Sequence, residues 1–304
     1  MFSQEIKNKA LEIGFSACGI TSAQYLSLER ETIYRNWLQK GFHADMFFLE
    51  HNLEKRMNPQ ILFEGTKSII VVLLNYHNPS YHKNRKSGYS FSEYALGIDY
   101  HIVLKNKLFE LSDFIIKHYP HSKNRIFTDT APVLEKYLAS RAGLGSIGKN
   151  TLLLTDKGSY YFIGEIYTDL CLPYDSPFAK DYCMQCERCV NACPTKALHS
   201  PYNLNAAKCI AYQSIENKNE IPKDIRTKMG KQVYGCDICQ QVCPCNAAAE
   251  PTNVKEFSIK EEFLKWNDSN WQEMNSDIFN KSFSNSVLHR VGYDRLMRNM
   301  GVSS

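Results

Sequence analysis

The sequence has no apolar segment long enough to cross a membrane. Its longest aliphatic run, Ile69 to Leu74, has six residues, whereas a membrane-spanning helix needs about 20. The first ten residues have no apolar core, no small-residue cleavage site and no twin-arginine pair, which are the features of export signals. We therefore expect a cytoplasmic protein with no membrane partner.

Neither sign of charge is in large excess. The 36 basic and 32 acidic residues leave a net charge of +4, which is compatible with a polyanionic partner without requiring one. A hydrophobic content of 43% and a charged content of 22% are those of an ordinary globular protein and exclude collagenous and disordered classes. At 304 residues, about two domains are expected.

Cysteine is the residue that this sequence has in excess. Nine of its 11 cysteines lie between Cys183 and Cys245, whereas a disulfide scaffold would spread them over a small secreted chain. In a reducing compartment, such a dense group is expected to hold metal. We expect Cys18 and Cys171 to be buried small hydrophobic residues and Cys245 to be a bystander.

The spacing of these cysteines predicts two [4Fe-4S] clusters. Cys183-x2-Cys186-x2-Cys189-x3-Cys193-Pro194 is the bacterial ferredoxin run, and Cys236-x2-Cys239-x3-Cys243-Pro244 repeats its latter part. The last cysteine of each run crosses to the other cluster in such proteins. One ligand set is then Cys183, Cys186, Cys189 and Cys243; the other is Cys193, Cys209, Cys236 and Cys239. Structural zinc would leave the third cysteine of each run without a role.

Three regions follow from the pattern of elements. Residues 1–175 alternate predicted helices with predicted strands. The helices are expected at 4–14, behind a Ser3 N-cap, at 103–117, and from Pro132 to Arg141. The strands are expected at 15–20, 68–74, 125–128, 151–154 and 161–167. This indicates an α/β domain, and a final hairpin across 156–159 makes the class α+β. Residues 176–250 are the two-cluster domain, and 251–304 are a helical C-terminal extension.

Two features of the first region could carry chemistry. Asp129 follows a predicted strand, the position at which open α/β sheets place ligands, although an ordinary turn or helix cap explains it equally well. Gly143-x-Gly145-x-x-Gly148 matches a dinucleotide motif but has a helix before it and a strand after it, so we reject it as a nucleotide site. His101 is interpreted as an ordinary histidine at a helix start.

Several motifs together resemble the epoxyqueuosine reductases, a cobalamin-dependent iron–sulfur family of queuosine-tRNA synthesis that is related to reductive dehalogenases. They are spread over residues 50–245 and comprise Leu53-Glu-Lys-Arg56, Tyr94-Ala-Leu-Gly-Ile-Asp-Tyr-His101, Thr128-Asp129-Thr130-Ala-Pro, Arg141-Ala-Gly-Leu-Gly, Gly148-Lys149-Asn150, the cysteine block and Tyr234-Gly-Cys-Asp237.

The resemblance implies a fold, cofactors and site residues. The fold would be a nitroreductase-like α/β cobalamin-binding domain followed by a ferredoxin-like two-cluster domain. The catalytic aspartate would be Asp129, and a raised pKa in a semi-buried pocket would suit its role as proton donor. The positions that match the family's cobalamin contacts are Arg56, Asp129, Lys149, Asn150, Leu153, Ser214 and Asp237. Ser92 and Glu93 stand where relatives often carry Cys or Arg.

The implied reaction is reduction of epoxyqueuosine to queuosine at the tRNA wobble position, with electrons from a low-potential donor passing through both clusters to cobalamin. Two alternatives are a cobalamin-dependent reductive dehalogenase and a non-enzymatic electron carrier. Two basic runs are candidate tRNA contacts, although a solvated surface is the commoner explanation of such runs: Lys83, Arg85 and Lys86, and Lys223, Arg226, Lys228 and Lys231. The chain ends without the helical repeats of longer members, so tRNA contacts made by those repeats are not expected.

Overall fold

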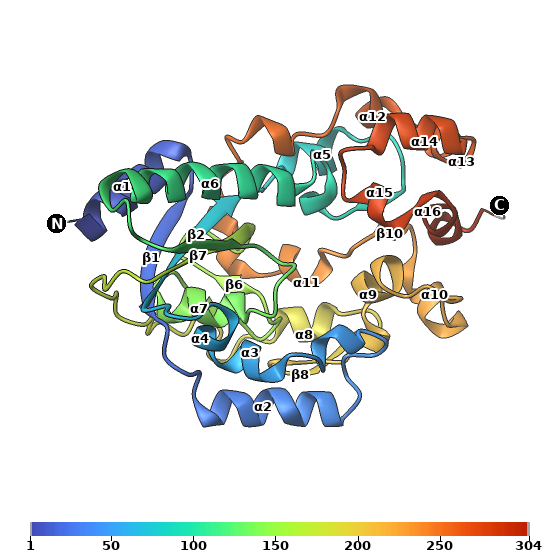
Figure 1. Ribbon diagram of the computed structural model, residues 1–304. Helices are drawn as coiled ribbons and strands as arrows, with labels where there is room; N and C mark the ends of the chain where they lie inside the picture. Colours follow the sequence, from blue (N-terminus) through green and yellow to red (C-terminus); the bar gives the residue numbers. More distant parts are fainter. Residues whose placement is uncertain (1, 303–304) are drawn as a thin grey trace.

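A computed structural model describes residues 2–302 and contains a four-stranded sheet built from residues 17–168 (Figure 1). The strand order is β1-β2-β7-β4, and every neighbouring pair is antiparallel. Their bounds are β1 Ala17–Ser22, β2 Ser68–Asn75, β7 Tyr161–Thr168 and β4 Asn124–Phe127. The continuous apolar run of β2 is buried on both faces, as predicted, because helices cover both sides of the sheet.

Helices α1 (Phe2–Ile13) and α6 (Tyr100–His118) cover one face of this sheet, where Ile70, Val72 and Leu74 join their core. The opposite face, with Ile69, Val71 and Leu73, packs against α3 (Leu53–Met57), α4 (Pro59–Leu62) and α7 (Glu135–Arg141). Figure 1 shows α1 and α6 above the sheet and α3, α4 and α7 below it. The first region is therefore a three-layer sandwich with mixed helix and strand content.

Three local expectations are wrong. Helix α1 begins at Phe2, so Ser3 lies inside the helix and does not cap it. Helix α7 begins at Glu135, because residues 129–134 form a turn that contains Pro132. Strand β6 (Leu153–Leu154) pairs with β5 (Ser146–Ile147) rather than with β7, and only a single bridge, Thr155 to Gly158, remains of the expected hairpin.

The cysteine-rich region consists of short elements that end near cysteines. They are α8 Arg188–Ala192, β8 Leu198–Ser200, β9 Asn203–Leu204, η3 Ala206–Lys208, α9 Ile210–Ile215, α10 Lys223–Met229, β10 Gln232–Tyr234, α11 Ile238–Gln241 and η4 Pro244–Ala248. All 11 cysteines are free thiols, and Cys171 is exposed rather than buried as expected. Among residues 2–302, no helix is long and apolar enough to span a membrane.

The C-terminal helices share an apolar core with residues 81–96. These helices are α12 Glu261–Lys265, α13 Asp268–Gln272, α14 Ser276–Phe283, α15 Leu288–Val291 and α16 Tyr293–Met300. They follow η5 Lys255–Phe257, whose Phe257 packs in the core of α1 and α6 instead. Trp271, Phe279 and Phe283 pack there with Phe91 and Tyr234. The latter two residues belong to β3 (Ser90–Phe91) and β10, which pair in parallel. The region predicted as a C-terminal extension is thus joined to the middle of the chain by a common core.

The remaining elements lie around these layers. They are α2 Leu28–Gln39, η1 Phe47–Leu49, α5 Pro79–Asn84 and η2 Glu93–Ala95. Helix α2 has no buried residue and lies at the bottom of Figure 1, below α3.

Candidate functional site

Asp129 lies in the turn that follows β4. Its backbone adopts the left-handed conformation, with φ of 53°, which is uncommon outside glycine, asparagine and aspartate. The turn is held in place because the Asp129 amide donates a hydrogen bond of 2.5 Å to Glu135 Oε1, in the first turn of α7. This backbone bend lets the carboxylate leave the edge of the sheet and reach the start of α6.

The Asp129 carboxylate receives two hydrogen bonds from the first turn of α6. Tyr100 Oη lies 2.9 Å and His101 Nε2 3.1 Å from Asp129 Oδ2. The other imidazole nitrogen of His101, Nδ1, lies 2.6 Å from Asp99 Oδ1, in the helix N-cap. The Arg290 guanidinium is 3.2 Å from both ring nitrogens, so it lies against the ring rather than in line with either nitrogen. His101 is therefore part of an Asp–His–Asp arrangement and not an ordinary helix-start residue.

This arrangement separates the pKa values of its members. Burial alone would raise the pKa of Asp129, but the hydrogen bonds from His101 and Tyr100 outweigh it and lower that pKa below its ordinary value. Burial alone would lower the pKa of His101, but the bonds to Asp129 and Asp99 raise it. The expected raised pKa of Asp129 is therefore wrong: at neutral pH the shared proton is held on the His101 side, and the two groups titrate as a pair.

Two cavities meet at Asp129. The larger has a volume of about 1040 Å³ and the smaller about 430 Å³, and Asp129 and Glu216 line both. The larger is lined by α2, the α3 region and the Asp129 turn, and the smaller by residues 215–218 and by helices α15 and α16. A group bound in one cavity would thus face a group bound in the other across the Asp129 carboxylate.

The larger cavity has aromatic walls and one cation with an unused donor. Tyr34, Trp37, Phe48 and Tyr137 supply aromatic surface. Arg56, a predicted site residue, is buried, and its Nη2 donates to Phe48 O at 3.0 Å. Its Nε is buried without a hydrogen-bond partner among the described residues. Because buried donors are nearly always paired in folded proteins, this N–H is suited to a ligand acceptor.

The smaller cavity combines tyrosines with cations. Tyr94, Tyr100 and Tyr234 line it together with three basic side chains, those of Lys218, Arg290 and Arg295. This composition suits an unstacked base with its phosphates. Sequence reasoning missed the two arginines, because they lie in the C-terminal region, 160 residues from Asp129, and only the fold brings them together.

One predicted ligand set surrounds a single space. Cys183, Cys186, Cys189 and Cys243 line one small cavity together with Asn150 and Cys245. The Lys149 amide donates to Cys183 Sγ at 3.3 Å, which is a type of hydrogen bond that stabilises thiolate sulfur. Cys245, expected to be a bystander, therefore borders this site as well.

The second predicted set is clustered too. Burial and the negative charges of Cys209 and Cys193 raise the pKa of the Cys236 thiol to about 12. The pKa of the Cys239 thiol is raised as well, first by burial and then by the negative charges of Cys236, Cys209 and Cys193. A metal that binds these four side chains as thiolates would supply the positive charge that offsets their mutual repulsion. The Asn150 side chain donates to Cys239 O at 3.3 Å, so the Lys149–Asn150 loop contacts both sets.

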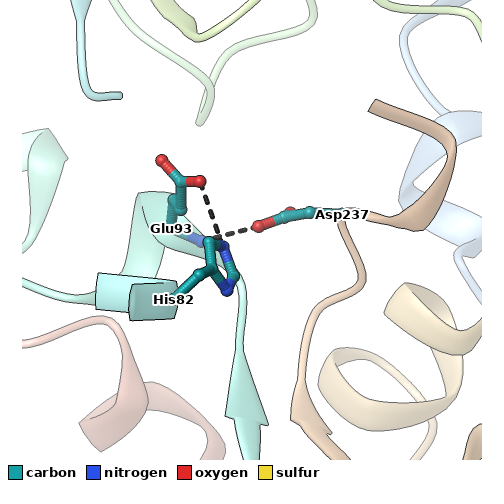
Figure 2. Close-up of side chains that lie close together, drawn as sticks. All are labelled: His82, Glu93 and Asp237. Atoms are coloured by element: carbon teal, nitrogen blue, oxygen red, sulfur yellow. Dashed lines mark hydrogen bonds and ion pairs between the residues drawn. The ribbon is translucent and has the colours of Figure 1, made fainter. Parts of the chain in front are cut away.

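Only two of the seven predicted cobalamin contacts, Arg56 and Asp129, line the cavities at Asp129. The other five line neither cavity: Lys149, Asn150, Leu153, Ser214 and Asp237. Leu153 is a buried core residue. The Ser214 hydroxyl is fully buried, accepts from the Gly235 amide at 2.9 Å and donates to Ile210 O. Asp237 lies beside His82 and Glu93 (Figure 2), and its Oδ2 accepts from the Glu93 amide at 2.8 Å.

Glu93, at a position where relatives often carry Cys or Arg, has a structural role. Its buried carboxylate lies 2.8 Å from His77 Nδ1 and 3.1 Å from His82 Nε2, and it accepts from the Asn78 amide. These bonds lower its pKa to about 2 despite burial, which acts in the opposite direction. Glu93 thus ties residues 77–82 to the turn that carries Cys236 and Asp237.

The two basic runs make mainly structural contacts. Arg85 donates to three backbone carbonyls, Arg226 Nη1 donates to Asn299 O at 2.6 Å, and Lys231 pairs with Asp268. None of the seven predicted basic residues lines either cavity at Asp129. The basic side chains that share the smaller cavity with Asp129 are instead those of Lys218, Arg290 and Arg295.

Two family models match the chain. The model described as "4Fe-4S double cluster binding domain" matches residues 182–246, which contain all eight predicted ligands. The model described as "Epoxyqueuosine reductase QueG, DUF1730" matches residues 56–130, from Arg56 to just past Asp129. The two matches therefore cover both halves of the site.

Known proteins resemble the chain over nearly its whole length. The epoxyqueuosine reductase of Leadbetterella byssophila is 42% identical over 300 residues, which are 98% of this chain and 97% of that protein. An epoxyqueuosine reductase crystallised with a tRNA-Tyr epoxyqueuosine-modified stem loop has a TM-score of 0.86 at 30% identity, covering 98% of this chain and 80% of that one. The Bacillus subtilis enzyme, with its aspartate-bearing catalytic loop swung out of the active site, matches with a TM-score of 0.87 at 30% identity and the same coverage.

Proposed function

Because the chain belongs to the epoxyqueuosine reductase family, it is an oxidoreductase, and we propose that it reduces epoxyqueuosine to queuosine at the wobble position of tRNA. The observation that carries the proposal is the position of Asp129, which lines two cavities of different chemical character. The larger would hold a cofactor and the smaller the modified base. The reaction would take place in the cytoplasm, where tRNA is present and free thiols persist.

We assign the larger cavity to cobalamin, and the α/β sandwich around it is then the nitroreductase-like domain implied by the family. The residues fit such a group: about 1040 Å³ of space, aromatic walls and the unpaired Arg56 Nε suit a large flat cofactor rimmed with amide oxygens. Arg56 and Asp129 would hold it. When bound, cobalamin would supply a strong reductant for the strained epoxide ring.

The smaller cavity would bind the substrate base. Tyr94, Tyr100 and Tyr234 offer stacking surfaces, and Arg290 and Arg295 offer charge for the anticodon phosphates. The clustered thiols of residues 183–243 would ligate two [4Fe-4S] clusters, with the Lys149–Asn150 loop between them. A low-potential electron donor is required.

Asp129 would pass a proton to the departing epoxide oxygen. Because its own pKa is lowered, the proton comes from the His101 imidazolium through the 3.1 Å hydrogen bond, while Asp99 stabilises the positive ring. Tyr100 fixes the orientation of the carboxylate through its hydroxyl. Arg290 lies against the imidazole, and its charge favours return of the ring to the neutral state after proton transfer.

The proposal is tested by converting a modified stem loop. Protein with both clusters reconstituted is incubated with cobalamin, a low-potential reductant and a stem loop bearing epoxyqueuosine, and the nucleosides are identified by mass spectrometry. We expect queuosine to form only when cobalamin is added. Protein that carries both clusters and cobalamin but forms no queuosine would contradict the proposed function.

A further inference from the structure

The sequence repeat places equivalent turns after Cys193 and Cys243, the two cysteines that are expected to cross between the clusters. In each turn a proline follows the cysteine, and the amide three residues on donates back to the cysteine carbonyl. Lys196 N lies 3.2 Å from Cys193 O, and Asn246 N lies 3.0 Å from Cys243 O. Because the two turns share this backbone hydrogen bond, their remaining differences come from the other groups of each turn.

The turn after Cys193 directs two hydrogen-bond donors at the cysteine sulfur. Thr195 Oγ1 lies 3.7 Å from Cys193 Sγ, and the Ala197 amide donates to the same sulfur at 3.3 Å. Lys196, between them, has φ of 54°, a left-handed conformation that costs energy in a residue other than glycine. The bend at Lys196 returns the chain toward the sulfur. Such strain persists where the surrounding structure holds it, which is often the case at functional sites.

The Thr195 hydroxyl is the donor in its contact with Cys193. Thr195 is 4% exposed, and its hydroxyl has no other side-chain or backbone partner among residues 2–302. A buried O–H without an acceptor would be costly, so this proton needs the sulfur. A cysteine that ligates iron is a thiolate, which can only accept a hydrogen bond. The O–H of Thr195 therefore points at Cys193 Sγ.

The first predicted ligand set receives no hydrogen bond from a hydroxyl. Cys245 occupies the position of Thr195 in the second turn and borders the same small cavity as Cys243, but a thiol is a weaker donor than a hydroxyl. The first set does receive a backbone donor, the Lys149 amide, at Cys183 Sγ. Among residues 2–302, Thr195 supplies the only hydroxyl that hydrogen-bonds a predicted ligand sulfur. The two clusters would thus differ in the donors that surround them.

A hydrogen bond to a ligand sulfur changes the reduction potential of the cluster. Reduction adds one electron to the cluster and breaks no bond, and the thiolate ligands share the added negative charge. A donor on such a sulfur is therefore bound more strongly in the reduced state, which raises the reduction potential. Because the turn already holds the Thr195 hydroxyl at the sulfur, no rearrangement is needed when the electron arrives.

We propose that Thr195, acting through Cys193, raises the reduction potential of the second cluster above the value it would have without the hydroxyl. The other ligands of this cluster are Cys209, Cys236 and Cys239. The higher potential favours transfer of one electron from the reduced first cluster, which is oxidised, to the oxidised second cluster, which is reduced. This inference rests on the two clusters of the proposed function and not on its substrate.

A redox titration monitored by electron paramagnetic resonance measures this effect without turnover. Reconstituted protein is titrated with a low-potential reductant, and the reduced fraction of each cluster is recorded. Valine has the shape of threonine but no hydroxyl, so we expect Thr195→Val to lower the ratio of reduced to oxidised second cluster at a fixed potential about threefold to tenfold. The first cluster should titrate as in the wild type. Thr195→Ser keeps the hydroxyl and should stay within about twofold of the wild-type ratio.

Two further variants show whether the effect is specific. Thr227→Val makes the same change at an exposed threonine of α10, whose hydroxyl donates to Lys223 O, and should leave both clusters unchanged. Cys243→Ala is expected to keep only the second cluster, and the effect of Thr195→Val should persist in that background. If Thr195→Val does not assemble its clusters, Thr195→Ala carries the same test.

The possible outcomes are distinct. A Thr195→Val protein that holds both clusters and titrates like the wild type would overturn the proposal, and so would a shift confined to the first cluster. If the valine variant shows the expected shift but wild-type protein forms no queuosine, the proposed function fails and this inference stands. If wild-type protein forms queuosine and the valine variant shows no shift, this inference alone fails.

Discussion

His101 Nε2 lies 3.1 Å from Asp129 Oδ2, while its Nδ1 lies 2.6 Å from Asp99 Oδ1. The imidazole therefore bridges the carboxylate that lines both cavities and a second carboxylate behind it. Opposed pKa shifts, upward for His101 and downward for Asp129, follow from this contact. The acid of the site is then the pair rather than Asp129 alone.

This contact between His101 and Asp129 determines whether kcat/KM rises or falls with pH. The pKa of His101 is raised above its ordinary value of 6.5, so the imidazolium is still the major form at pH 6.5 and is lost as the pH rises through the raised pKa. Asp129 stays ionised over the same range. We expect kcat/KM to fall on the alkaline side, and His101→Gln to lower it about tenfold to a hundredfold and remove this limb. An identical alkaline limb in His101→Gln would argue against the pair.

Arg56 tests the assignment of the larger cavity. Arg56→Met keeps an unbranched side chain that reaches the position of Nε but removes the buried Nε donor and the rest of the guanidinium, so we expect cobalamin affinity to fall about tenfold or more. Absorbance titration of the apoprotein measures this directly. Lys55→Met, at the exposed neighbouring position of α3, is the matched control and should bind cobalamin as the wild type does. Equal affinities of the two variants would place cobalamin elsewhere.

Cys243 and Cys245 border the same small cavity, but ferredoxin spacing assigns only Cys243 as a ligand. We expect Cys243→Ala to bind about four irons per chain instead of about eight, and Cys245→Ala to keep the full complement. Iron analysis and electron paramagnetic resonance of the reduced proteins distinguish the two. Loss of a cluster in Cys245→Ala together with its retention in Cys243→Ala would reverse the assignment.

Asn299 joins the C-terminal helix to the cysteine-rich region. Its buried side chain donates to Ser214 O and Val233 O, both at 2.8 Å. Asn299→Ala leaves two buried carbonyls unpaired, which is expected to cost about 1–3 kcal/mol of unfolding free energy. Denaturant unfolding measures this difference, with Asn280→Ala on the exposed face of α14 as the control. A stability equal to that of the control would show that water replaces these bonds.

Much of the molecule could be predicted from local pattern. The apolar run of β2 and the periodicity of α6 specify buried elements without reference to the rest of the chain. The cysteine spacing predicts a double-cluster region, which the family model over residues 182–246 confirms. The assignment of individual cysteines to each cluster stays a prediction. Asp129 was identified by its place after a strand and by the family motif around it.

The features that could not be predicted depend on contacts between residues that lie far apart in the sequence. Strand β7 pairs with β2 and β4 in an antiparallel arrangement, which strand-and-helix alternation does not reveal. Arg290 reaches His101 from 189 residues away, and no local pattern in a helix marks that contact. The lowered pKa of Asp129 depends on the same assembly, because the hydrogen bonds that outweigh burial come from α6.

The most direct test of the account compares the wild type with Asp129→Asn on a stem loop bearing epoxyqueuosine. Asparagine keeps the shape of the side chain but cannot relay the proton from His101, so clusters and cobalamin should bind normally while queuosine formation falls by a factor of about 10² to 10⁴. Asp113→Asn, at an exposed position of α6, should convert the stem loop at the wild-type rate. An Asp129→Asn enzyme that forms queuosine at a near wild-type rate would contradict the account.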